Sequence, residues 1–166
     1  ALVQMRNEHI RALVSLDGTE RYVFSTLQKS PFADMNQVDV PYIHMAQKEI
    51  PQAVMEAEGM DPKLNTEFLY FDELTNSEAY SLRFHDMTHA YFSTMGVLFQ
   101  KRDPRQDKSD AEIMASYKLV CHYTLQFLEA YLNGEQDSKA WLKHSPEENG
   151  IGEELISVKR KEAVKQ

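Results

Sequence analysis

The sequence predicts an α/β protein with about three parallel strands, flanking helices and a long C-terminal helix. Three short apolar segments, near residues 10–16, 40–45 and 79–84, have the length and composition of strands. The stretches between them have helical character and are long enough for crossover connections. Apolar residues then recur at helical spacing near residues 110–133. Strand, helical crossover and strand in alternation favour a parallel sheet, because such connections are right-handed and return to the same sheet.

Each predicted strand has its own signal. The first, IRALVSL, is a continuous apolar run closed by Asp17 and Gly18, which is typical of a strand buried on both faces. The second, VPYIHM, has Pro41 at its entry, where the absent N–H costs no ladder bond. The third, AYSLRF, alternates between two sets of side chains, as the two faces of a strand require.

The helices of the C-terminal part have recognisable ends. Ser109 and Glu112 have the spacing of a capping box, and Gly134 is a typical helix stop. A shorter helix is predicted over DSKAWLKHS. The tail, IGEELISVKRKEAVKQ, fits either a short strand or a frayed helix, and we interpret its basic residues as a solvated surface.

Composition excludes several classes of protein. With 42% apolar residues, residues 1–166 are expected to form a single domain or part of one. The net charge of -8 argues against nucleic acids and anionic membranes as partners, and no apolar run is long enough for a membrane span. Cys121 is the only cysteine, so no internal disulfide is possible, and its apolar surroundings predict a buried side chain. The sequence is compatible with two locations: the cytoplasm, or the outside of the cell after processing of an upstream segment.

The segment RFHDMTHAYFS contains two histidines, His85 and His89, four residues apart. On a helix they would share a face and could bind zinc. However, the alternation up to Phe84 places His85 at the end of a strand, so the two rings would not lie one turn apart. Asp86 is also one methylene shorter than the glutamate of zinc-dependent hydrolases. We therefore predict no metal and no cofactor, and a strand that ends before a short helix near His89.

Two polar residues follow predicted strands and are candidates for a catalytic pair. Asp17 comes directly after the first strand, and His89 follows the third. Catalytic groups of open parallel sheets gather beyond the carboxyl ends of the strands. We therefore expect the Asp17 carboxylate and the His89 imidazole to lie close together at one edge of the sheet.

The segments around these residues resemble the C-terminal half of a serine α/β-hydrolase. VSLDGTERYVF, VPYIHM and RFHDMTHAYFS, followed by the long helix and AWLKHS, are most similar to the platelet-activating-factor acetylhydrolase and dienelactone-hydrolase-like branches. The resemblance covers residues 5 to about 145. In the acetylhydrolase branch the triad acid lies in an L-D segment, which Leu16 and Asp17 match. The triad histidine lies in a V-H-x-x-F segment, which THAYF matches with Thr88 in place of Val.

The resemblance also leaves a second candidate acid. In many other α/β-hydrolases the acid follows the next strand, and here that loop, AQKEIPQ, offers Glu49. Tyr91, Phe92 and Met95 would line an acyl or leaving-group pocket, or would pack as helix core.

One essential part of the family pattern does not occur in the chain. The nucleophile elbow, G-x-S-x-G, is absent, because none of the six glycines brackets a serine at that spacing. The order serine, acid, histidine would place the serine upstream of residue 1. The resemblance thus implies the acid/base half of an enzyme that hydrolyses small carboxylic esters, and a chain that is inactive alone.

Two expectations about partners follow. The apolar segment IRALVSL would expose an unpaired strand edge, so we expect self-association or pairing with the N-terminal half that carries the nucleophile. The alternative function is a non-catalytic α/β interaction module or a degenerate hydrolase half, which the absent serine favours.

Overall fold

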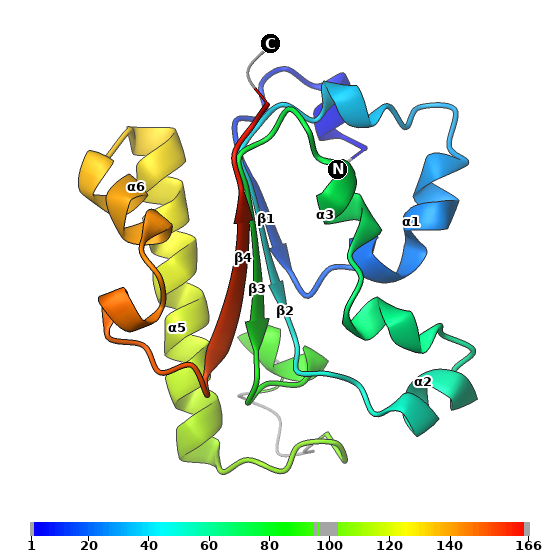
Figure 1. The fold of residues 1–166 in the computed structure, drawn as a ribbon, viewed down its shortest axis with the longest axis vertical. Coiled ribbons are helices and arrows are strands. Elements are labelled where there is room, and N and C mark those ends of the chain that lie inside the picture. Colours follow the sequence, from blue (N-terminus) through cyan, green and yellow to red (C-terminus); the bar gives the residue numbers. More distant parts are fainter. Residues whose placement is uncertain (1, 95, 97–102, 165–166) are drawn as a thin grey trace.

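The computed structural model describes residues 2–94, 96 and 103–164, and these contain one mixed sheet of four strands (Figure 1). The strands lie side by side in chain order: β1 (Leu13–Leu16), β2 (Tyr42–Ala46), β3 (Ala79–Phe84) and β4 (Ile156–Lys161). β1, β2 and β3 are parallel, whereas β4 runs antiparallel to β3. The predicted α/β class is confirmed.

The three predicted parallel strands are present, and the C-terminal tail, for which the sequence left strand and helix open, adds the antiparallel strand β4. Every residue of β4 is paired with β3, from Ile156 opposite Phe84 to Lys161 opposite Ala79. Its charged residues lie on an edge strand, where they remain accessible to water and discourage pairing with another chain. The tail was ambiguous because this pairing is set by β3, far away in the sequence.

Helices cover both faces of the sheet (Figure 1). On one side lie α1 (Glu20–Gln28), α2 (Gln52–Ala57) and α3 (Leu69–Glu73). On the other lie α5 (Asp110–Leu128) and α6 (Gln136–Lys143). Short 3-10 turns connect these elements at Gln4–Arg6, Met35–Gln37, Pro62–Asn65, His89–Phe92 and Glu147–Asn149.

The long helix has the ends that the sequence predicts. The Ser109 hydroxyl accepts a hydrogen bond from the Glu112 backbone N–H, and the Glu112 carboxylate accepts one from the Ser109 backbone N–H. α5 continues into a π-helical turn, Glu129–Asn133, which ends at Gly134 with a φ of 79°. That backbone conformation is easiest for glycine, so the helix stops where the glycine stands.

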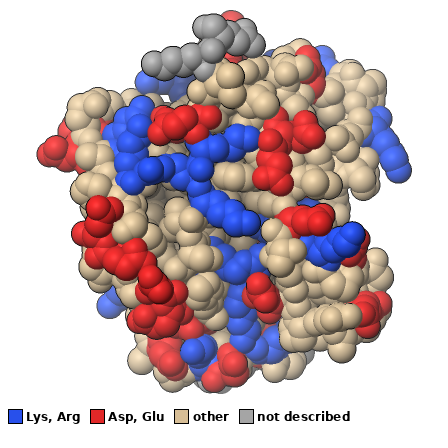
Figure 2. Space-filling model, in the orientation of Figure 1, with Lys and Arg blue, Asp and Glu red and all other residues tan. Residues whose placement is uncertain are grey.

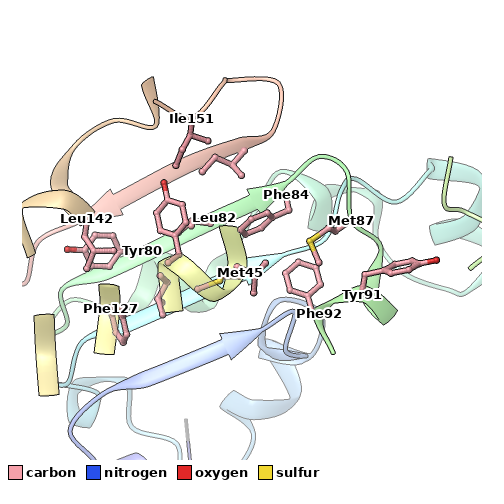
Figure 3. Close-up of a cluster of buried hydrophobic side chains, with 14 of the residues drawn as sticks. Met45, Tyr80, Leu82, Phe84, Met87, Tyr91, Phe92, Phe127, Leu142 and Ile151 are labelled. Atoms are coloured by element: carbon pink, nitrogen blue, oxygen red, sulfur yellow. The ribbon is translucent and has the colours of Figure 1, made fainter. Parts of the chain in front are cut away.

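The main hydrophobic core lies between the sheet and α5 and α6 (Figure 3). Alternate residues of β2 and β3 face it, because successive side chains of a strand point to opposite faces. Its members include Ile43, Met45, Tyr80, Leu82, Phe84, Phe127 and Leu142. A second, smaller cluster lies against α1 and α3 and includes Phe24, Val38, Tyr42, Phe68, Tyr70 and Leu74.

Two predictions about burial are wrong. β1 is not buried on both faces: it is a terminal strand that pairs only with β2 among the described residues, and Leu16 is 42% exposed. It also begins at Leu13 rather than at residue 10. Cys121 is exposed, because it lies on the outward side of α5 and not on the side that packs against the sheet.

Candidate functional site

Asp17 is the first residue after β1, at the carboxyl edge of the sheet. Its backbone N–H donates to the Met45 carbonyl of β2 over 2.7 Å, so the residue is held against the neighbouring strand. Its φ of 48° is positive, a conformation that aspartate tolerates better than most residues. The residue is 2% exposed. The end of the strand therefore fixes a buried carboxylate at this edge.

The carboxylate of Asp17 binds the imidazole of His89. The distance from Asp17 Oδ2 to His89 Nδ1 is 2.7 Å. His89 begins the 3-10 turn His89–Phe92, which follows β3 by a short loop. The two residues lie close together, as the order of the parallel strands predicts.

Gln47 joins the two residues from the loop after β2. Its backbone N–H donates to Asp17 Oδ1 over 3.0 Å, and its side-chain Oε1 accepts from the backbone N–H of His89 over 3.1 Å. Both carboxylate oxygens of Asp17 are thus engaged, one by each neighbour. Sequence reasoning missed Gln47, although its position directly after a central strand, at the same edge as Asp17 and His89, was a usable signal.

The Asp17–His89 pair has one buried and one exposed member. The Asp17 side chain is 1% exposed, whereas the His89 side chain is 64% exposed. The hydrogen bond to Asp17 raises the pKa of His89, and partial burial of the ring opposes this shift. Because a carboxylate only accepts hydrogen bonds, the proton of the neutral ring lies on Nδ1 and leaves Nε2 as the atom that can exchange protons. This arrangement suits general acid–base chemistry at Nε2.

The other candidates of this region lie elsewhere. Among the described residues it is Asp17, not Glu49, that binds His89, and Glu49 lines a hollow together with Arg83 and His85. Tyr91 and Phe92 are buried in the main hydrophobic core (Figure 3), which corresponds to the packing interpretation of these residues. Met95 lies outside the described residues.

His85 has different partners from His89. Its Nδ1 donates to the Glu154 carbonyl over 3.1 Å, and its Nε2 lies 3.4 Å from the Ser157 hydroxyl. The His85 ring therefore faces β4, whereas the His89 ring faces Asp17. Within residues 2–94, 96 and 103–164, no group of three or more histidine, cysteine or acidic side chains is arranged to hold a metal ion.

A third histidine, His44 in the middle of β2, is fully buried. Its Nδ1 lies 3.0 Å from the Ser15 hydroxyl and 3.2 Å from the Tyr42 hydroxyl. Burial, reinforced by the nearby charge of Arg21, lowers the pKa of His44 to about 3. Ser15 and His44 form a serine–histidine contact, but they are only 7% and 0% exposed, so an ester carbonyl has no access to this serine. The contact belongs to the interior of the protein.

Comparisons with known proteins find no match for this chain among protein-family models, curated proteins or solved structures. No helix in the described part of the chain is long and apolar enough to cross a membrane.

Proposed function

We propose that this chain supplies the acid and the base of a serine hydrolase that acts on carboxylic esters. The observation that carries the proposal is the 2.7 Å hydrogen bond between a buried Asp17 carboxylate and an exposed His89 ring at the carboxyl ends of the parallel strands. An imidazole held in one tautomer by a buried carboxylate is the acid–base unit of serine hydrolases on unrelated folds. Asp17 is the acid in this proposal, and Glu49 is not.

The serine nucleophile would come from a segment that precedes residue 1. G-x-S-x-G does not occur in this chain, and the order serine, acid, histidine is usual for the α/β-hydrolase fold. In that fold, the strand that precedes the nucleophile lies in the part of the sheet that would adjoin β1 of this chain. The outer side of β1 has no paired strand among the described residues, so a partner strand from the nucleophile-bearing half can bind there.

The reaction would transfer an acyl group to water in two steps. His89 Nε2 removes the serine proton while the serine oxygen attacks the ester carbonyl, and the same proton is then given to the leaving alcohol oxygen. Water repeats the sequence on the acyl-enzyme and releases the carboxylic acid and the free serine. Asp17 keeps the proton on Nδ1 and stabilises the imidazolium that forms in each step. Backbone N–H groups beside the serine would stabilise the oxyanion.

The test compares residues 1–166 with a longer polypeptide that also contains the segment encoded upstream. We expect the longer protein to contain a nucleophile elbow, to react with a fluorophosphonate probe and to hydrolyse p-nitrophenyl acetate, whereas residues 1–166 alone do neither. His89→Ala should lower both rates by several powers of ten. Asp17→Asn should cause a large loss, and Glu49→Gln a far smaller one.

His144→Ala is the matched control, because His144 lies directly after α6 and its ring contacts Asn149 and not the Asp17–His89 pair. An upstream sequence without a nucleophile elbow, or equal rates for His89→Ala and His144→Ala, would overturn the proposal. The same results would favour a non-catalytic interaction module.

A further inference from the structure

A hollow of about 260 Å³ lies on the side of the sheet that α1 and α3 cover. Its walls come from α1, from the segment before and within α3, and from β3 and β4. The residues on which the argument depends are Arg21, Phe68, Phe71, Ser81, Arg83 and Lys159. Neither Asp17 nor His89 lines this hollow, so it is separate from the proposed catalytic pair.

Arg21 is a buried cation with an unused donor. The residue is 6% exposed, and its Nη1 donates to the carbonyls of Leu64 and Glu67, each over 3.1 Å. Its Nε is shielded from solvent and has no hydrogen-bond partner among the described residues. The guanidinium lies 4.3 Å from the centre of the Phe68 ring, which fixes its plane from one side. An unused N–H of a buried guanidinium is costly unless something accepts its hydrogen bond.

Arg83 is a second guanidinium in the same wall. Its Nη1 donates to the Gln47 carbonyl over 3.5 Å, and its Nη2 donates to the Asn65 carbonyl. Neither Arg21 nor Arg83 forms an ion pair with a carboxylate in the described part of the chain. Burial and the charge of Arg83 both lower the pKa of Arg21. Each guanidinium is bound by neutral backbone carbonyls and not by a carboxylate, so the two like charges favour an anion beside them.

Lys159 of β4 adds a third cation to the lining. Glu49 and Asp72 also line the hollow, so it carries both signs of charge, with the cations in excess. Figure 2 shows Lys and Arg side chains in an interrupted band on one face of the molecule, and the edge strand β4 carries Lys159, Arg160 and Lys161. The band favours the approach of a small anion to this side of the molecule.

We propose that this hollow binds a small molecule with an oxyanion group, a phosphate or a carboxylate, attached to an apolar ring. Arg21 and Arg83 both line the hollow, and guanidinium groups are preferred partners of such oxygens. The hydroxyl of Ser81 provides a further donor within the lining. Phe68 and Phe71 form the apolar part of the wall, against which the ring of the ligand packs.

The experiment is a titration of the whole chain followed by its backbone amide NMR signals. The probes are phenyl phosphate, benzoate and inorganic phosphate, with phenol as the neutral comparison, all at constant ionic strength. We expect saturable shifts at Ser81 and Arg83 with phenyl phosphate, with benzoate, or with both, and none with phenol. Tighter binding of phenyl phosphate than of benzoate assigns a phosphate, and the reverse order assigns a carboxylate. Inorganic phosphate should bind more weakly because it lacks the ring.

Arg83→Gln tests the donor and Arg160→Gln is its matched control. Arg160 is the neighbour of Lys159 in β4, but it does not line the hollow and donates to the Lys143 carbonyl. Arg83→Gln should weaken binding about 10-fold or more, because a charge-assisted hydrogen bond is lost. Arg160→Gln should change the affinity less than about twofold.

Lys159→Gln serves as a second variant, because Arg83 also holds two carbonyls and its replacement can disturb folding. Lys159 is exposed, and its loss should weaken binding about two- to fivefold. The absence of saturable shifts with both organic anions would overturn the proposal. Equal affinities of Lys159→Gln and Arg160→Gln, or shifts confined to residues outside the hollow, would do the same.

Discussion

The two faces of the sheet differ in what they bury, because one is apolar and the other combines a smaller apolar cluster with polar side chains. The face toward α5 and α6 carries apolar residues, among them Ile43, Tyr80 and Leu82. On the opposite face a row of aligned residues crosses all four strands: Ser15, His44, Ser81 and Lys159. The same strands supply both sets, because successive side chains of a strand point to opposite faces of the sheet.

The two faces of the sheet contribute differently to stability and to chemistry. The face toward α5 and α6 packs the larger apolar cluster, whereas the opposite face combines a smaller apolar cluster with groups that can bind or exchange protons. Asp17, His44 and Arg21 influence one another electrostatically there, since the charges of Arg21 and Asp17 shift the pKa of His44 in opposite directions. Buried polar groups beside the apolar cluster under α1 and α3 cost stability, so this is the region in which a function is to be sought.

The largest expected effect is on the apolar face. Phe127 is fully buried between α5 and the sheet, and its ring packs against Tyr80 and Tyr131. Phe127→Ala should lower the free energy of unfolding by about 3 to 5 kcal/mol through lost burial and a cavity. Ser81→Ala, on the opposite face of β3, should cost less than about 1 kcal/mol. Urea unfolding measures the free energy of unfolding of both variants. Equal losses would contradict the conclusion that the apolar face contributes more to stability than the opposite face.

The next effect is a pH dependence that comes from His44. Its pKa in the folded protein is lowered to about 3, so the unfolded chain binds a proton that the folded chain does not. The stabilisation is present above the unfolded pKa of about 6.5 and is lost as the pH falls toward the folded value, by about 3 kcal/mol at pH 4.

His44→Gln should flatten this part of the stability profile. The measurement is the slope of the unfolding free energy between pH 6.5 and pH 4, which does not depend on how stable the variant is at neutral pH. An unchanged slope would mean that other groups cause the acid sensitivity.

A smaller effect is expected at the end of α5, which covers the apolar face. The Ser109 hydroxyl accepts from the Glu112 N–H over 3.3 Å at an exposed helix terminus. Ser109→Ala should cost about 1 kcal/mol, less than any loss inside the core. Ser109→Thr keeps the capping oxygen and should retain most of the stability in the same thermal unfolding experiment.

Local signals in the sequence predicted the parallel strands and the meeting of Asp17 with His89. Each residue follows a strand, and the carboxyl ends of parallel strands meet at one edge, so proximity follows from order alone. Pairings between distant segments were beyond the same reasoning. β4 was ambiguous because its charged residues suit an edge strand and a frayed helix equally. The hollow beside Arg21 depends on Phe68, Arg83 and Lys159, whose approach only the fold determines.

The most direct test of the central claim is an NMR titration of the His89 ring in the wild-type chain, in Asp17→Asn and in Glu49→Gln. The hydrogen bond to Asp17 raises the pKa of His89, so its contribution to stability is fully present below the ordinary value of about 6.5 and is lost as the pH rises through the folded pKa. We predict a raised pKa and a neutral ring protonated at Nδ1 in the wild type and in Glu49→Gln, and a lower pKa in Asp17→Asn. An Asp17→Asn protein whose His89 titrates as in the wild type would contradict the pair on which the proposed function rests.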